Sequence, residues 1–229
     1  MTSHDSRLTR SFPASKTVWA EAPALIRQTP NGRSLEILGF QVMQDWETQL
    51  MVRMAEAVSW KHAKVLEIGY GLGISAGLIQ QRQPQVHVII EANSQVAQAA
   101  RDRLWPADAH APPYVIEAFW QEVLSEALVE AYAPGGFDGI LFDTFPLSPR
   151  EVRRNHFDFF PHVSSLLRSG GNFTYYSDEA ESLSEEHRAR LQSAFGDTLV
   201  ETEIVTVAPP HDCEYWSQRT LLHVVVTKQ

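Results

Sequence analysis

Three glycines at alternate positions form the part of the sequence best suited to bind a ligand through its backbone. The apolar run Lys64-Val65-Leu66-Glu67-Ile68 is followed by Gly69, Gly71 and Gly73, and then by Ile74-Ser75. Because glycine has no Cβ, backbone N–H groups in such a loop can approach a ligand closely, and a following helix directs its positive end to the same place. The sequence therefore predicts a buried strand, a binding loop and a helix. A tight turn without a ligand is the alternative.

The spacing of these glycines distinguishes between nucleotide cofactors. A dinucleotide fingerprint has its third glycine three residues after the second, where this chain has Ile74. Here the third glycine comes two residues after the second, and Glu67 precedes the first glycine by two. The pattern E-x-G-x-G-x-G resembles the S-adenosylmethionine loop of Rossmann-like methyltransferases, and it disfavours a nicotinamide dehydrogenase.

A second acidic residue supports a nucleoside ligand. The segment Val86-His87-Val88-Ile89-Ile90-Glu91 is typical of a strand, and its carboxylate comes about 20 residues after the glycines. A carboxylate at the tip of the second strand suits the two hydroxyls of a ribose. A solvated Glu91 is the alternative.

Two further carboxylates are candidates for binding and deprotonating an acceptor. Asp143 ends the apolar run of residues 137–142, where such methyltransferases place residues that contact the acceptor; as an alternative, it caps a loop. Glu47 lies in a stretch whose apolar residues recur three or four apart, which predicts one amphipathic helix over residues 42–58. A solvated position on that helix is the alternative for Glu47.

The elements that position these residues alternate between strand and helix. Helices are predicted over residues 74–81, 94–104 (with Ser94 as N-cap), 157–167 and 184–195, and further strands over residues 114–118, 137–143, 172–176, 199–207 and 221–227. The last two strands have no clear helix between them. The pattern predicts an α/β fold: a Rossmann-like, seven-stranded, mostly parallel sheet with helices on both faces and an antiparallel last strand.

One such domain is expected, preceded by two shorter segments. At 229 residues the chain is long enough for a single α/β domain with a full core, which we assign to residues 61–229. Residues 1–18 are polar and are expected to form a flexible tail. Residues 19–60 are expected to form a lid and a helix over the active site.

Composition excludes several classes of function. The chain has 19 Lys and Arg residues against 28 Asp and Glu and no dense basic run, which argues against a nucleic-acid surface and fits a small or cationic substrate. No apolar run approaches about 20 residues, so no membrane span is expected. Without a signal peptide and with Cys213 as the only cysteine, we expect a reducing, cytoplasmic setting. No second cysteine accompanies His211-Asp212-Cys213, so a structural turn is favoured over a metal site.

Several separated motifs in the same order resemble the guanidinoacetate N-methyltransferase family, from about residue 19 to residue 228. The matching segments are residues 42–48, 66–71, 89–93, 137–147 and 208–215. By this resemblance, S-adenosylmethionine, which leaves as S-adenosylhomocysteine, is held by Trp19, Met43, Met51, Gly69, Tyr70, Gly71, Leu72, Gly73, Ile74, Ser75, Glu91, Ala118, Phe119 and Asp143. The resemblance also implies that Glu47 and Asp143 grip the guanidino group of the acceptor.

Two carboxylates suit the methylation of a guanidinium ion. With a pKa of about 12.5–13.8, this group is neutral in only about one molecule in 10⁶ at pH 7. Carboxylates orient its planar N–H fork and can accept a proton as the charge leaves. Proton loss to Asp143 or to Glu47 is therefore expected to accompany methyl transfer or to follow it closely.

The turn after the fifth strand departs from the family pattern. The family places a short, uncharged polar turn against the substrate carboxylate, whereas this chain has Ser177-Asp178-Glu179-Ala180-Glu181. Asp178 and Glu179 would repel a carboxylate unless backbone N–H groups bind it and the side chains point away. We hypothesise that both bind an acceptor with an amine or a larger body, such as arginine, agmatine or a guanidine-bearing natural-product intermediate. A solvated turn with the conventional substrate is the alternative.

The sequence thus predicts an S-adenosylmethionine-dependent N-methyltransferase that acts on guanidinoacetate or a related small guanidine. A monomer or homodimer without nucleic-acid or membrane partners is expected. A protein arginine N-methyltransferase is one alternative, and a non-catalytic, cofactor-binding interaction subunit is another.

Overall fold

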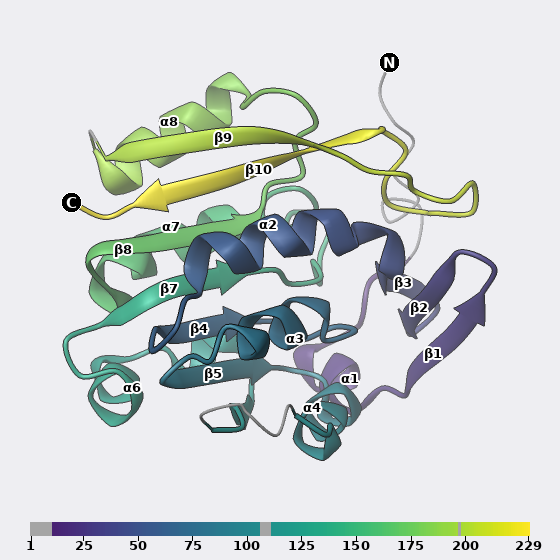
Figure 1. The fold of residues 1–229 in the computed structure, drawn as a ribbon. Coiled ribbons are helices and arrows are strands. Elements are labelled where there is room, and N and C mark those ends of the chain that lie inside the picture. Colours follow the sequence, from purple (N-terminus) through teal and green to yellow (C-terminus); the bar gives the residue numbers. More distant parts are fainter. Residues whose placement is uncertain (1–10, 106–110, 197) are drawn as a thin grey trace.

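A seven-stranded sheet forms the centre of the protein (Figure 1). The computed structural model describes residues 11–105, 111–196 and 198–229, and in this part of the chain the strand order is β6-β5-β4-β7-β8-β10-β9. The strands are β4 (Lys64–Ile68), β5 (Val86–Glu91), β6 (Tyr114–Glu117), β7 (Phe137–Phe142), β8 (Leu167–Tyr176), β9 (Leu199–Thr206) and β10 (Thr220–Thr227). Neighbours among β4 to β8 are parallel, and β10 runs antiparallel to both β8 and β9. The predicted fold class is confirmed.

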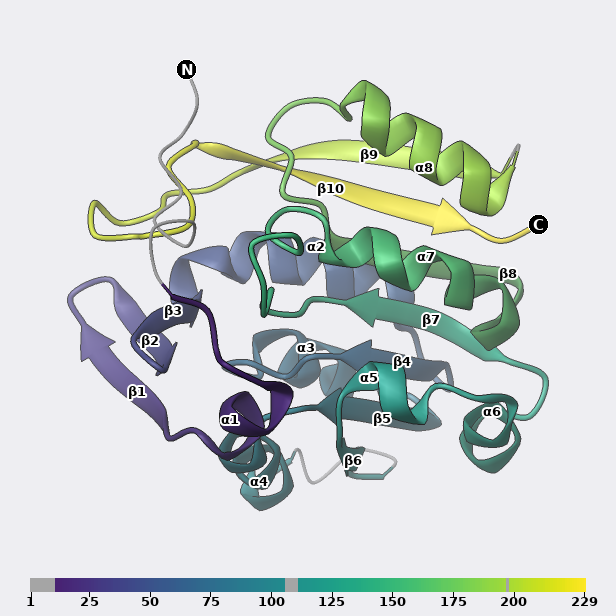
Figure 2. The ribbon, with the colours of Figure 1, turned by 180° about the vertical axis from the view of Figure 1, so that it is seen from behind.

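Helices cover both faces of this sheet (Figures 1 and 2). One face carries α2 (Thr48–Val58), α3 (Ile74–Gln81) and α4 (Ser94–Asp102), and the other carries α5 (Trp120–Val123), α6 (Glu126–Tyr132), α7 (Asn155–Leu166) and α8 (Glu185–Phe195). Val65 packs into the first apolar core and Leu66 into the second, because successive side chains of a strand alternate between faces. Burial on both faces explains why the inner strands are almost continuously apolar.

A separate antiparallel sheet of three strands precedes the central sheet. It contains β1 (Ala24–Thr29), β2 (Gly32–Ile37) and β3 (Phe40–Gln44), and a short helix, α1 (Lys16–Glu21), comes before it. Residues 1–10 of the predicted tail lie outside the described residues.

The helix predicted over residues 42–58 is wrong in its first part. Val42 and Met43 belong to β3, a 3₁₀ turn η2 (Asp45–Glu47) follows, and α2 begins only at Thr48. The physical reason is cross-strand pairing: Met43 lies opposite Leu35 of β2, and such contacts override local spacing.

The other predicted elements are confirmed with changes at their ends. The N-cap of α4 is Asn93 rather than Ser94, since the Asn93 side chain accepts hydrogen bonds from the N–H groups of Gln95 and Val96 at 3.1 Å. β8 begins at Leu167, five residues before the predicted start, because the Gly170-Gly171 pair lies within the strand where its register with β7 shifts. The short helices α5 and α6 were not predicted.

Candidate active site

A cavity lies where the carboxyl ends of the parallel strands meet the small sheet. This is the expected ligand position in an open α/β sheet. Residues predicted for the site that line the cavity are Trp19, Met43, Glu47, Gly69, Tyr70, Gly71, Ser75, Glu91, Ala118, Phe119, Asp143 and Asp178. Those predicted for the site that do not line the cavity are Met51, Leu72, Gly73, Ile74 and Glu179.

The glycine loop adopts a backbone that other residues rarely accept. Gly69, Gly71 and Gly73 have φ of +89°, +54° and +67°. A Cβ on Gly69 would overlap the carbonyl oxygen of Asp143, and a Cβ on Gly71 would lie 2.6 Å from Sδ of Met43. The loop therefore lies directly against Asp143 on one side and against Met43 of β3 on the other, and these contacts require glycine at both positions.

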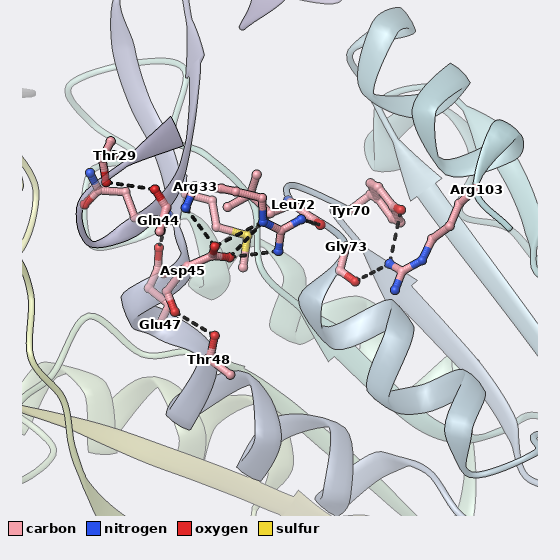
Figure 3. Close-up of polar contacts among 12 residues, drawn as sticks. Thr29, Arg33, Gln44, Asp45, Glu47, Thr48, Tyr70, Leu72, Gly73 and Arg103 are labelled. Atoms are coloured by element: carbon pink, nitrogen blue, oxygen red, sulfur yellow. Dashed lines mark hydrogen bonds and ion pairs between the residues drawn. The ribbon is translucent and has the colours of Figure 1, made fainter. Parts of the chain in front are cut away.

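Two arginines that sequence reasoning missed support this loop from either side (Figure 3). Arg33 of β2 binds Asp45 through Nη2 at 2.8 Å and Nε at 3.1 Å, and its Nη1 donates to the Leu72 carbonyl at 3.5 Å. Arg103 donates through Nη1 to the Gly73 carbonyl at 2.6 Å. Both are single arginines far from the loop in sequence, so no local pattern indicated their role.

Glu67 lies behind the loop rather than in the cavity. It is fully buried, accepts a hydrogen bond from the Ser75 hydroxyl, and its Oε2 lies 2.8 Å from Nε2 of His87. Since Ser75 lies in the first turn of α3, this carboxylate holds the start of the helix against the end of β4.

Glu91 connects the glycine loop to the end of β5. Its Oε2 accepts the Tyr70 N–H at 2.9 Å and its Oε1 accepts the Asn93 N–H at 2.8 Å. Burial raises the pKa of Glu91, and these backbone hydrogen bonds oppose that rise. The carboxylate is therefore held at the cavity wall in one orientation, where a ribose is expected.

Asp143 directly follows β7, and its carboxylate borders the cavity. Its backbone N–H donates to the Ile68 carbonyl at 2.9 Å, which fixes it beside the first residue of the glycine loop. Burial raises the pKa of Asp143 to about 7, and the negative charges of Asp178 and Glu67 add to the rise. A carboxylate with this pKa can accept a proton near neutral pH.

Glu47 is buried, so it does not occupy a solvated helix position. Its Oε1 accepts the Gln44 N–H at 2.9 Å and the Tyr215 hydroxyl at 2.5 Å. Tyr215 comes from the loop after β9 and is itself buried, which raises the pKa of its hydroxyl well above the ordinary value. Sequence reasoning included Tyr215 in a matching segment but assigned it no role.

Trp19 of α1 covers the cavity beside the end of β5. Its ring stacks on Phe145 with centroids 4.9 Å apart and an interplanar angle of 8°. The Asn93 side chain donates to the carbonyls of Trp19 at 2.9 Å and Ala22 at 2.8 Å, which ties α1 to the strand that carries Glu91.

Asp178 and Glu179 point in different directions. Asp178 lines the cavity, whereas the Glu179 carboxylate accepts the Ser184 N–H at 3.2 Å and lies 3.5 Å from Nδ1 of His187. The other ring nitrogen of His187 contacts the Tyr175 hydroxyl at 2.7 Å. Glu179 thus belongs to a polar network with His187 and Tyr175, which are both buried.

The described ranges contain neither a candidate metal cluster nor a candidate membrane-spanning helix. No group of three or more His, Cys, Asp and Glu side chains there is arranged to hold a metal ion. None of the helices described is both long enough and apolar enough to cross a bilayer.

A family model described as guanidinoacetate N-methyltransferase matches residues 11–229, almost the whole chain. The chain belongs to the guanidinoacetate N-methyltransferase family. Methyl transfer in this family uses S-adenosylmethionine, and the cavity fits that group because the glycine loop and Glu91, whose carboxylate accepts the Tyr70 N–H, line it together. The chain is therefore a member of a family of S-adenosylmethionine-dependent methyltransferases.

Curated relatives of this family member carry the name protein arginine N-methyltransferase 2. The one from Aspergillus fumigatus is 32% identical over 140 residues, which is 59% of this chain and 30% of the relative. The one from Candida glabrata is 34% identical over 140 residues (59% and 32%), and the one from Neurospora crassa is 30% identical over 158 residues (64% and 35%). The chain spans about a third of the length of these relatives.

Solved structures with a similar fold include methyltransferases and a related transferase. Spermidine synthase from Thermotoga maritima has a TM-score of 0.58 at 15% identity, covering 91% of this chain and 70% of that chain. A protein assigned as a methyltransferase and complexed with SAH has a TM-score of 0.56 at 9% identity, covering 90% and 57%. At these identities the likeness concerns the fold, which is that of class I methyltransferases.

Proposed function

We propose that this protein transfers a methyl group from S-adenosylmethionine to a guanidino nitrogen of a small-molecule acceptor. The observation that supports this most is the meeting of Glu47 and Asp143 with the glycine loop and Glu91 around one cavity. Two carboxylates match the N–H fork of a guanidinium, and the loop and Glu91 match a nucleoside.

The glycine loop, Glu91 and Phe119 would hold S-adenosylmethionine, which supplies an electrophilic methyl group on a sulfonium ion. Glu91 would accept hydrogen bonds from the ribose hydroxyls, since its carboxylate is already fixed by two backbone N–H groups. Trp19 and its stacked partner Phe145 would exclude water from the cavity.

Glu47 and Asp143 would perform different tasks on the acceptor. Glu47 is held by the Gln44 N–H and the Tyr215 hydroxyl, so it is suited to orient the guanidinium. Asp143 has a pKa near neutrality, so it is suited to accept the proton that leaves the nitrogen as the new C–N bond forms. Holding the nitrogen in line for transfer supplies much of the remaining acceleration.

An arginine side chain of a protein is the second candidate acceptor. The names of the curated relatives favour it, and its guanidino group would meet the same two carboxylates. Both acceptors therefore belong in the same assay.

The proposal is tested by methyl transfer from labelled S-adenosylmethionine, with products identified by mass. The panel contains guanidinoacetate, agmatine, arginine, an arginine-containing peptide and matched amines without a guanidine. We expect label on a guanidino nitrogen. Transfer only to compounds without a guanidine, or none despite cofactor binding, would overturn the proposal.

The Tyr215→Phe variant is expected to lower kcat/KM for the acceptor. It removes the hydroxyl that donates to Glu47, and hydrogen bonds to charged groups contribute about 1.5–3 kcal/mol, which corresponds to about a ten- to hundredfold loss. Steady-state kinetics measure the effect. Tyr114→Phe is the control, because that side chain is 51% exposed on β6. Equal kcat/KM in the two variants would contradict a role for the Tyr215 hydroxyl.

The acceptor kcat/KM is expected to rise with pH through a limb centred on the Asp143 pKa of about 7. Only the ionised carboxylate pairs with a guanidinium, so activity is lost as pH falls below that pKa. The charge of Asp178 adds to the rise in pKa, so Asp178→Asn is expected to move the limb to lower pH. Glu181→Gln removes a charge from an exposed side chain nearby and serves as the control. An unmoved limb in Asp178→Asn would count against this assignment.

A further inference from the structure

Arg103 does not line the cavity of the candidate active site, yet it contacts the glycine loop that does (Figure 3). It directly follows α4, and its Nη1 donates to the Gly73 carbonyl at 2.6 Å and to the Tyr70 hydroxyl at 3.4 Å. Tyr70 lines the cavity, and Gly73 is the N-cap of α3. One guanidinium therefore holds both the part of the loop that borders the cavity and the part that starts the helix.

The Arg103 guanidinium occupies a seat formed by Gly73, Gly77 and Trp105. A Cβ on Gly73 would lie 2.7 Å from Nη1, and a Cβ on Gly77 would lie 2.5 Å from Nη2. Trp105 completes the seat, since Cζ of Arg103 lies 4.7 Å from the centroid of its ring, within the range of a cation–π contact.

Gly77 has a cost that this seat explains. It lies within α3, where glycine is less favourable than alanine. The three atoms nearest to a Cβ at this position all belong to the Arg103 guanidinium. The helix therefore carries a glycine where the guanidinium needs the space.

Arg101, on the same helix, is used differently. It is exposed and pairs with the Glu117 carboxylate at 2.9 Å. Arg103 instead directs its charge to neutral oxygens of the loop, a carbonyl and a hydroxyl. Because hydrogen bonds with a charged donor are shorter and stronger than neutral ones, these contacts are suited to fix the loop backbone.

The glycine loop needs such contacts because it separates two cavities. Tyr70 and Gly71 line the cavity of the candidate active site and also a second one, and Arg103 lines the second. A segment with open space on both sides has fewer packing contacts than a core segment, and its local stability is lower. The contacts of Arg103 on the side of the second cavity then contribute more to the conformation of the loop.

We propose that Arg103 is a positioning residue for S-adenosylmethionine, which keeps the glycine loop in its binding conformation before the cofactor arrives. Binding to a loop that is already ordered does not lose the entropy of ordering it, so the affinity is higher. Arg103 acts through Gly73 and Tyr70 and does not itself contact the cofactor. The proposal concerns the cofactor of this family and holds for either candidate acceptor.

Arg103→Gln is expected to raise the Kd for S-adenosylmethionine by about tenfold to a hundredfold, the range for loss of a hydrogen bond to a charged group. Calorimetry with the cofactor alone measures this Kd. Once the cofactor is saturating, the loop is ordered, so kcat and the acceptor KM are expected to change far less. Arg103→Lys retains a charged donor and is expected to recover part of the affinity. Arg101→Gln is the control and is expected to leave the Kd unchanged.

Gly77→Ala tests the seat without altering Arg103. The new methyl group lies where Nη2 is now, so the guanidinium must leave the seat, whereas alanine itself favours the helix. We expect the Kd to rise as in Arg103→Gln. In the double variant the two effects are not expected to add, because both substitutions remove the same contact. Thermal unfolding of each variant shows that the fold is retained.

Several outcomes would overturn the proposal. They are an unchanged Kd in Arg103→Gln or Gly77→Ala, an equal rise of the Kd in Arg101→Gln, and no recovery in Arg103→Lys. A loss of kcat at saturating cofactor as large as the loss of affinity would also overturn it, since Arg103 would then act on the chemical step or on the whole fold. If no guanidine accepts a methyl group, the proposed function fails, and the calorimetric test of Arg103 still applies.

Discussion

Asp143→Asn is expected to lower the rate of methyl transfer by about 10²- to 10⁴-fold, the usual contribution of a positioned acid or base. Asparagine has the same shape and keeps the backbone hydrogen bond to the Ile68 carbonyl. It carries no charge to pair with a guanidinium, and it cannot accept the departing proton. The glycine loop and Glu91 are left in place, so the affinity for S-adenosylmethionine is expected to change far less.

Two measurements check this result. Single-turnover transfer of labelled methyl gives the rate of the chemical step, and calorimetry gives the affinity for the cofactor. Asp102→Asn, on an exposed face of α4, is the control and is expected to match the unmodified protein. A rate for Asp143→Asn within about tenfold of that protein would rule out the role proposed for the carboxylate.

Gly69→Ala is expected to weaken S-adenosylmethionine binding by at least about a hundredfold, or nearly 3 kcal/mol. The new Cβ would overlap the carbonyl oxygen of Asp143, which is backbone and cannot rotate away. The φ of +89° adds about 1–2 kcal/mol of strain for a residue with a side chain. The glycine loop and the end of β7 must move apart to make room for the new Cβ, so the S-adenosylmethionine site and the acceptor site are both distorted.

A second glycine separates the overlap from the strain. Gly135 has a φ of +85°, and a Cβ there would meet no atom within 4 Å. Gly135→Ala is therefore expected to lower the free energy of unfolding by about 1–2 kcal/mol and to leave the affinity for S-adenosylmethionine unchanged. Calorimetry and thermal unfolding of both variants provide the comparison. Similar cofactor affinities in the two would show that close approach at Gly69 is unimportant.

Local patterns were sufficient to predict the central sheet. Apolar runs separated by helical spacing identify β4, β5 and β7, and the parallel order then places Glu91 and Asp143 at the same edge. The small sheet was missed because β1 to β3 are held by pairing with one another, which no local period reveals. At the junction of β3 and η2, apolar residues continue the helical spacing of α2. This spacing is why one helix was predicted over residues 42–58.

The parts of the site that were not predicted depend on distant contacts. Tyr215 is 168 residues from Glu47, and only the fold brings its hydroxyl to that carboxylate. Asp178 and Glu179 look equivalent in the sequence, yet only Asp178 lines the cavity, whereas the Glu179 carboxylate accepts the Ser184 N–H. Side-chain direction within a turn depends on backbone angles that the residue types do not specify.

The contacts of Arg33 join the two halves of the candidate site. The arginine binds Asp45, two residues before Glu47, and also donates to the Leu72 carbonyl in the glycine loop. If S-adenosylmethionine stiffens the glycine loop when it binds, less entropy is lost when the acceptor then orders Glu47. Thermodynamic linkage requires the acceptor to raise the affinity for S-adenosylmethionine by the same factor. We therefore expect one side chain remote from the reacting atoms to couple the binding of S-adenosylmethionine to that of the acceptor.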